Sequence, residues 1–188
     1  MRTIAFLACL AFAAPALAAN APPQLAPNAA KEIVTLIPRL ARAGSADAAK
    51  PIEAHVLELF RESGSPSIDL LMTRASAAAQ GGDAATASKL LESITEIAPG
   101  FAEAWHIRGM MAAAADQDGL AIVYLNRAIS LNPNQFQAMA DLGGILDEYG
   151  DKKQALQYFR KALAIDPYLE GLDKEVEQLS RQVEGEKI

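Results

Sequence analysis

Three observations predict an all-α protein built from a helical repeat. The composition is apolar but poor in aromatic residues (51% and 6% of 188 residues), which favours helix over sheet. Apolar residues recur at spacings of three and four along the chain instead of alternating. One pattern also returns with a period of 34 residues. The length suits one domain with a sizeable core.

The first 18 residues have the layout of a secretory signal peptide. Arg2 gives a positive start, residues 4–14 form an apolar run, and Ala16-Leu17-Ala18 matches a small-x-small cleavage site. A membrane anchor needs about 18 or more apolar residues, and this run is shorter and is interrupted by Pro15. We expect cleavage after Ala18 and export, with a periplasmic and a secreted location both open.

The cleaved chain would contain no cysteine, because Cys9 lies within the signal peptide. Disulfides and thiol chemistry are therefore excluded, and lipidation would need that cysteine at the cleavage point. Cleavage removes one of 17 basic residues and none of 23 acidic ones, so the net charge becomes −7. Such a surface disfavours nucleic acid and favours neutral or basic partners.

Residues 19–29 hold three prolines and no charge, and we expect a flexible leader there. Residues 30–63 then read as a helical hairpin, with helices over about 30–43 and 48–61 around a Gly44-Ser45 turn. Whether this hairpin is a degenerate fourth repeat is left open, since its only sign, Pro66, is one residue out of phase.

Residues 68–101, 102–135 and 136–169 carry the 34-residue period. Six columns stay in phase without a gap, which leaves little room for chance. The columns are Pro99, Pro133 and Pro167; Ala87, Ala121 and Ala155; Leu91, Leu125 and Phe159; Ile94, Ala128 and Ala162; Leu71, Trp105 and Met139; and the small residues Ala75, Gly109 and Gly143.

These columns resemble the tetratricopeptide repeat, whose motif is Trp-x2-Leu-Gly-x2-Tyr, then Ala-x3-Phe, then Pro. The resemblance implies a right-handed superhelix of helix-turn-helix pairs, in which small residues lie where the paired helices cross. Arg74 and Arg108 stand in place of the motif's Leu. We expect looser packing there. Residues 170–188 are expected to form a capping helix and tail, with an apolar face that covers the last repeat.

The resemblance also implies that a partner peptide binds along the first helix of each repeat. Helical spacing from the Trp position selects the candidates Asp69, Met72, Ser76, Glu103, His106, Met110, Gln137, Ala140, Gly144 and Asp147. Methionine adapts to varied partners, so we expect a peptide with apolar side chains and a neutral or basic flank. A scaffold without a groove partner is the alternative. The Lys and Asn side chains with which some family members grip chaperone tails are missing at these positions.

No catalytic motif is present, and we expect a non-catalytic interaction module without cofactor or metal. The chain has two histidines in different segments, and it lacks G-x-S-x-G, P-loop and H-E-x-x-H patterns. A soft metal ion held by Met72, His106 and Met110 is the only metal hypothesis, and ordinary packing accounts better for these residues. The alternative function is a self-associating structural subunit of an envelope complex.

Overall fold

The computed structural model describes residues 25–185, and in that part of the chain all regular structure is α-helical. The expected signal peptide and most of the leader lie outside the described residues. No helix among residues 25–185 is both long and apolar enough to span a bilayer. The helices are α1 (Pro27–Leu40), α2 (Ala46–Phe60), α3 (Pro66–Gln80), α4 (Ala84–Ile97), α5 (Ala102–Ala113), α6 (Asp118–Leu131), α7 (Phe136–Glu148), α8 (Lys152–Ile165) and α9 (Leu172–Glu184).

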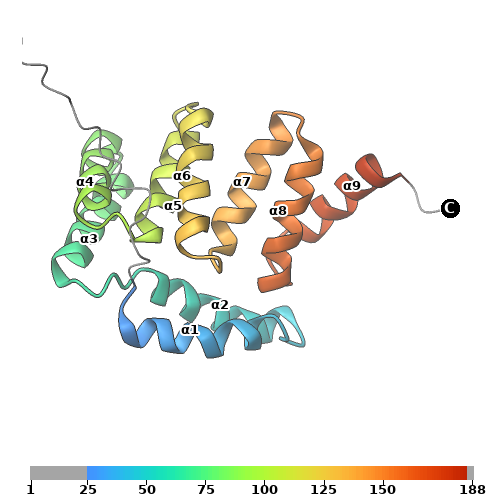
Figure 1. The fold of residues 1–188 in the computed structure, drawn as a ribbon, viewed down its shortest axis with the longest axis horizontal. Coiled ribbons are helices and arrows are strands. Elements are labelled where there is room, and N and C mark those ends of the chain that lie inside the picture. Colours follow the sequence, from blue (N-terminus) through green and yellow to red (C-terminus); the bar gives the residue numbers. More distant parts are fainter. Residues whose placement is uncertain (1–24, 186–188) are drawn as a thin grey trace, which may run out of the picture.

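Helices α3 to α8 form three antiparallel pairs that stack in chain order (Figure 1). Each second helix also packs on the first helix of the next pair, so the stack is continuous from α3 to α9. The all-α superhelix of helix-turn-helix repeats predicted from the sequence is therefore confirmed.

Small residues lie where the paired helices cross. Ala87, Ala121 and Ala155 are each 0% exposed. A Cβ built on Gly109 would lie 2.7 Å from Cγ of Leu125, so only glycine allows this approach of α5 to α6. The helix pairs can thus come close enough to bury the larger apolar side chains beside them.

The turn inside each pair is closed by one residue with a left-handed backbone. Gly82, Asp116 and Gly150 occupy equivalent positions, with φ of 80°, 56° and 80°. In each turn the next N–H bonds back to a carbonyl five residues earlier, as from Gln117 to Ala112 at 2.9 Å. Asp116 is the only non-glycine residue with positive φ among the described residues.

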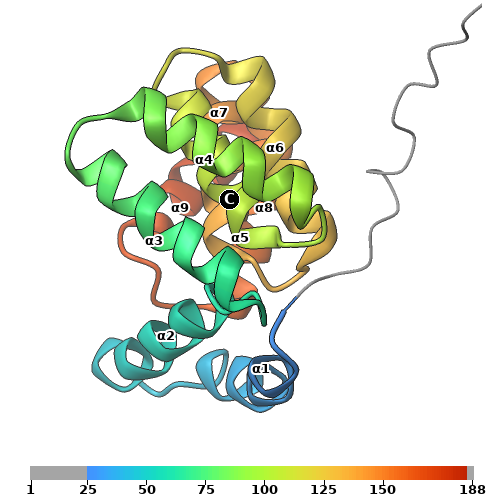
Figure 2. The same ribbon diagram turned by 90° about the vertical axis from the view of Figure 1, so that its left-hand side faces the viewer.

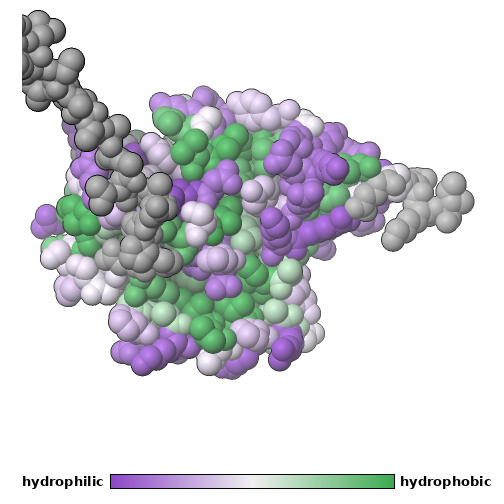
Figure 3. All heavy atoms as spheres, viewed as in Figure 1, coloured by the Kyte–Doolittle hydropathy of each residue, from purple (hydrophilic) through white to green (hydrophobic). Residues whose placement is uncertain are grey.

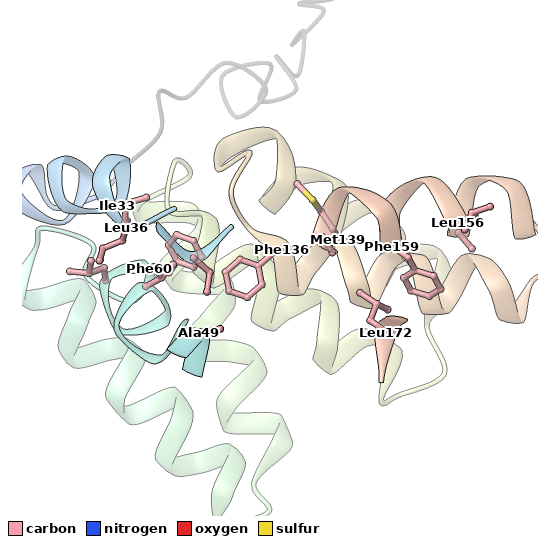
Figure 4. Close-up of a cluster of buried hydrophobic side chains, with 14 of the residues drawn as sticks. Ile33, Leu36, Ala49, Phe60, Phe136, Met139, Leu156, Phe159 and Leu172 are labelled. Atoms are coloured by element: carbon pink, nitrogen blue, oxygen red, sulfur yellow. The ribbon is translucent and has the colours of Figure 1, made fainter. Parts of the chain in front are cut away.

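The N-terminal hairpin lies across the foot of the stack instead of extending it (Figures 1 and 2). The Phe60 and Phe136 ring centroids are 6.1 Å apart, which joins the end of α2 to the start of α7. A single buried cluster runs from Ile33 and Leu36 of the hairpin to Leu172 of α9 (Figure 4). The hairpin therefore packs across the ends of several helix pairs and does not continue the stack as a further repeat.

The start of the first helix differs from that expected. The leader was expected to reach residue 29, whereas α1 begins at Pro27, because proline is well tolerated in the first turn of a helix. At the other end, α9 packs on α8 with Leu172 and Leu179 buried.

In the view of Figure 3, apolar surface lies over the hairpin and the middle of the stack, while the side over α8 and α9 is mostly hydrophilic.

Candidate functional site

The first helices of the second and third repeats, α5 and α7, line a hollow of about 540 Å³ together with residues of α6, α8 and α9, and we call it the groove hollow. Met110 of α5, Ala140 and Gly144 of α7 and Leu172 of α9 are among its lining residues. Met110 is 49% exposed, and a Cβ built on Gly144 would meet no atom within 4 Å. The floor is thus apolar and open, because small residues on α7 leave room in front of it.

The rim of the groove hollow is acidic. Its carboxylates come from the α5–α6 turn and from α6, α7 and α9, and no Lys or Arg of residues 25–185 lines it. Such an arrangement concentrates negative potential over an apolar floor and attracts cationic groups. The acidic lining residues are Asp116, Asp118, Asp141, Glu148 and Glu175.

A second hollow of about 600 Å³ lies farther along the first helices, beside α3. Asp69, Met72 and Ser76 line it together with Arg61 and Glu62, which follow the hairpin. Asp69 is already engaged, because the backbone N–H and the hydroxyl of Ser63 donate to its Oδ1 at 3.0 and 2.6 Å. Asp69 therefore holds the loop before α3, and Met72 is 6% exposed.

The structure divides the predicted groove residues into separate groups. Met110, Ala140 and Gly144 lie together in the groove hollow, and Asp69, Met72 and Ser76 lie in the second hollow. Glu103 and His106 are buried instead of facing the groove, at 8% and 3% exposure. Gln137 and Asp147 are half-buried. Helical spacing gave the side of the helix but could not show that the next repeat covers the side chains at Glu103 and His106.

His106 is the centre of a polar network between α5 and α7. Its Nε2 lies 2.8 Å from Oδ2 of Asp141, and its Nδ1 lies 3.4 Å from Oε2 of Glu103. Gln135 donates from Nε2 to the same Glu103 oxygen at 2.6 Å. Arg61 approaches the other Glu103 oxygen at 4.0 Å. The network is satisfied within the protein and ties successive repeats together.

The charge of His106 follows from its partners. Burial alone would lower the pKa of His106, but the hydrogen bonds and charges of Asp141 and Glu103 outweigh it and raise the pKa to about 9. The imidazole is therefore protonated at neutral pH and donates from both nitrogens. This cation pairs with Asp141 and therefore offsets the charge of that one acidic residue of the groove hollow.

Helical spacing predicts acidic residues near the edge of the groove, but it did not select the residues that form the acidic rim or the partners Asp141 and Gln135 of His106. Asp141, Glu148 and Glu175 lie beside or beyond the positions that helical spacing selected, and Gln135 lies before α7 begins. The one available signal was that Asp141 lies 35 residues after His106, about one repeat away. A polar residue about one repeat length farther along the sequence can contact its counterpart in the preceding repeat.

Comparison with known proteins relates two of the three repeats to a family. The tetratricopeptide repeat model matches residues 102–135 and 136–168. Cellulose synthase operon protein C of Escherichia coli K12 is 34% identical over 92 residues, which cover 48% of this chain and 8% of that protein. A TPR repeat-containing protein of Rhizobium etli is 23% identical over 152 residues, which cover 81% of this chain and 74% of the Rhizobium protein.

Solved structures share the fold at low sequence identity. A crystal structure of MamA protein superposes with a TM-score of 0.58 at 20% identity and covers 84% of both chains. The first TPR domain of Spaghetti (RPAP3), bound to the HSP90 peptide SRMEEVD, gives a TM-score of 0.58 at 14% identity, covering 62% of this chain and 93% of that one.

Proposed function

We propose that this chain, two of whose repeats match the tetratricopeptide repeat model, binds a segment of a partner protein in the groove hollow. The segment would carry an apolar side chain for the floor and a Lys or Arg for the rim. Among the similar structures, the TPR domain of Spaghetti holds a peptide, which supports a binding role for this fold. The role is that of a non-catalytic adaptor, and the signal-peptide pattern of residues 1–18 supports action after export.

The observation that carries this proposal is the open apolar floor at Met110, Ala140 and Gly144 beneath an acidic rim. Methionine is half exposed there, and an exposed apolar strip framed by polar residues is typical of a contact surface. The acidic rim selects against an acidic tail such as SRMEEVD, because like charges would face each other. A basic segment would gain from the same field.

The test uses the cleaved chain and two labelled probe peptides of equal length, one alternating Lys with Leu and one alternating Glu with Leu. Fluorescence anisotropy at about 0.15 M salt should show binding of the Lys peptide only. Gly144→Leu fills the hollow from a position where a Cβ meets no atom, and should abolish binding. Gly44→Leu, in the α1–α2 loop, has equally free space and is the matched control.

Equal binding of both peptides, or binding that Gly144→Leu leaves unchanged, would contradict the groove hollow as the site. The alternative function, a self-associating envelope subunit, is tested on the same sample by light scattering at several concentrations. A monomer throughout favours the adaptor. A stable oligomer that excludes the Lys peptide favours self-assembly.

A further inference from the structure

A third hollow, which we call the rear hollow, lies on the other side of α5 from the groove hollow. It has a volume of about 310 Å³ and lies between α4 and α6, with Arg108 of α5 among its lining residues. Ala84, Ala85 and Ser88 of α4 leave it open because their side chains are small. Its size is at the lower end of the range for small-ligand pockets.

Arg108 is held in one position by three helices. Its Nη1 donates to Oγ1 of Thr95 on α4 at 2.6 Å, and its Nη2 donates to the hydroxyl of Tyr124 on α6 at 3.0 Å. Its Cζ lies 4.4 Å from the Tyr124 ring centroid and 5.3 Å from that of Trp105. A guanidinium fixed in this way loses little entropy when it binds a further group.

The charge of Arg108 has no carboxylate partner in the part of the chain that the structure describes. None of the described ion pairs involves it, and no Asp or Glu of the described segment lines the rear hollow. The two hydrogen bonds use two of its five N–H donors, so three remain. The rings of Tyr124 and Trp105 offset only part of the cost of placing a cation here.

The first turn of α4 presents backbone N–H groups near the rear hollow, although the ionised carboxylate of its N-cap Asp83 offsets part of their positive potential. Ala84 and Ala85 are the first two residues of this helix, and N–H groups at that position have no partner within the helix. The N-cap Asp83 accepts from the backbone N–H of Thr86 at 3.0 Å, which leaves the two alanine N–H groups without that cap. Helix N-termini favour anionic groups.

We propose that the rear hollow binds a carboxylate group, with Arg108 as its ion-pair partner. A guanidinium and a carboxylate pair through two parallel N–H···O bonds, and the free donors of Arg108 can supply them. The carboxylate can belong to a small organic acid or to an Asp or Glu side chain of a partner. This site is independent of the groove hollow, which lies on the other side of α5 and is acidic.

The chain carries its own reporter, because Trp105 is its single tryptophan and lies beside Arg108. Tryptophan fluorescence is recorded during titration with succinate, against sodium chloride at matched ionic strength. A second titration uses acetyl-Gly-Asp-Gly-amide, with the Asn peptide as its neutral counterpart. If the fluorescence changes saturably with succinate alone, the bound carboxylate belongs to a small acid. If it changes with the Asp peptide but not with the Asn peptide, the carboxylate belongs to a side chain of a partner.

Three variants decide where binding occurs. Arg108→Met removes the cation, and Ser88→Phe blocks the hollow while it leaves Arg108 and its partners in place. Each should weaken binding by about tenfold or more, the loss expected for a charge-assisted pair. Lys89→Met removes the same charge from an exposed neighbour outside the hollow and should keep the wild-type affinity. The proposal is overturned if neither probe saturates beyond the chloride response, or if Ser88→Phe binds as the wild type does.

Discussion

Gly143 of α7 lies directly against the ring of Phe159 in α8. A Cβ built on Gly143 would lie 2.5 Å from the ring carbons Cδ1 and Cε1, closer than real contacts allow. The next residue, Gly144, has no atom within 4 Å of its Cβ position. Two adjacent glycines of one helix therefore have different reasons to be small, one in packing and one at the groove hollow.

Alanine at these two positions should have different effects on stability. Both changes gain the same helix propensity, so the difference between the variants is the clash at Gly143, about 1–3 kcal/mol in the free energy of unfolding. Gly144→Ala alone should stabilise by roughly 1 kcal/mol. Urea denaturation of both variants measures the difference. Equal stability of the two would mean that α7 and α8 do not approach as described.

Stability should fall with rising pH because of His106. The pKa of His106 is about 9 in the folded chain, above the ordinary value of 6.5 for an unfolded histidine. Protonated His106 therefore stabilises the folded chain fully below pH 6.5, and this stabilisation is lost as the pH rises through 9. The free energy of unfolding should fall by about 3 kcal/mol in all. Denaturant melts between pH 6 and pH 9.5 measure this slope.

Two variants separate His106 from other groups that titrate in this range. His106→Gln should flatten the profile between pH 6.5 and 9, because an amide does not titrate. Asp141→Asn removes the partner at 2.8 Å and should shift the descending limb to lower pH. His55 serves as an internal comparison: its hydrogen bond to Glu32 also raises its pKa, but both groups are exposed to solvent, so His55→Gln should change the profile far less than His106→Gln. A His106→Gln profile as steep as the wild type would refute the assignment.

The repeat could be predicted from the sequence, whereas the network of His106 could not. Columns such as Ala87, Ala121 and Ala155 repeat because the same helix crossing occurs in every pair, so packing leaves a periodic trace. The hydrogen-bonded set of His106, Gln135 and Asp141 is not repeated along the chain, because these residues pair with one another at a single junction between two repeats. A contact that occurs once leaves no period, and only the stacked coordinates reveal it.

The environment of Arg108 could not be predicted from the sequence either. Its place in the motif belongs to leucine, so looser packing was expected at that position. The structure instead surrounds the guanidinium with the rings of Trp105 and Tyr124 and with the hydroxyl of Thr95. Tyr124 and Thr95 come from other helices, and their approach to Arg108 depends on the angle between α4 and α6. Residue spacing within α5 contains no information about that angle.

The hairpin should be held to the stack in part by Phe60 and Phe136. Both rings are buried, at 2% and 0% exposure, and they meet at an interplanar angle of 53°. A double-mutant cycle with alanine at both positions should give a coupling of about 0.5–1.5 kcal/mol in the free energy of unfolding. Phe60 and Phe159, which lie in different helices and form no ring contact in the described chain, provide the matched pair, whose coupling should be clearly smaller.

The position of the hairpin also lay beyond sequence reasoning. Its first helix follows from the spacing of Ile33, Leu36 and Leu40, which marks one apolar face. That face fits equally well against a following repeat or across several of them. Gly64, with φ of 78°, turns the chain between α2 and α3, and Ala26 packs 3.2 Å from the position of its missing Cβ. This turn allows the hairpin to lie across the foot of the stack.

The turn at Asp116 should reverse the usual preference for alanine over glycine. Asp116 has φ of 56°, a left-handed conformation that glycine adopts freely and that costs other residues roughly 1–2 kcal/mol. Asp116→Gly should therefore be more stable than Asp116→Ala by about 1 kcal/mol, as thermal melts can measure. At Gly119, in the first turn of α6 without a positive φ, the order should be the ordinary one, and Gly119→Ala should stabilise the chain. If alanine proved the better residue at Asp116 as well, the turn of the middle repeat would not share the backbone of Gly82 and Gly150.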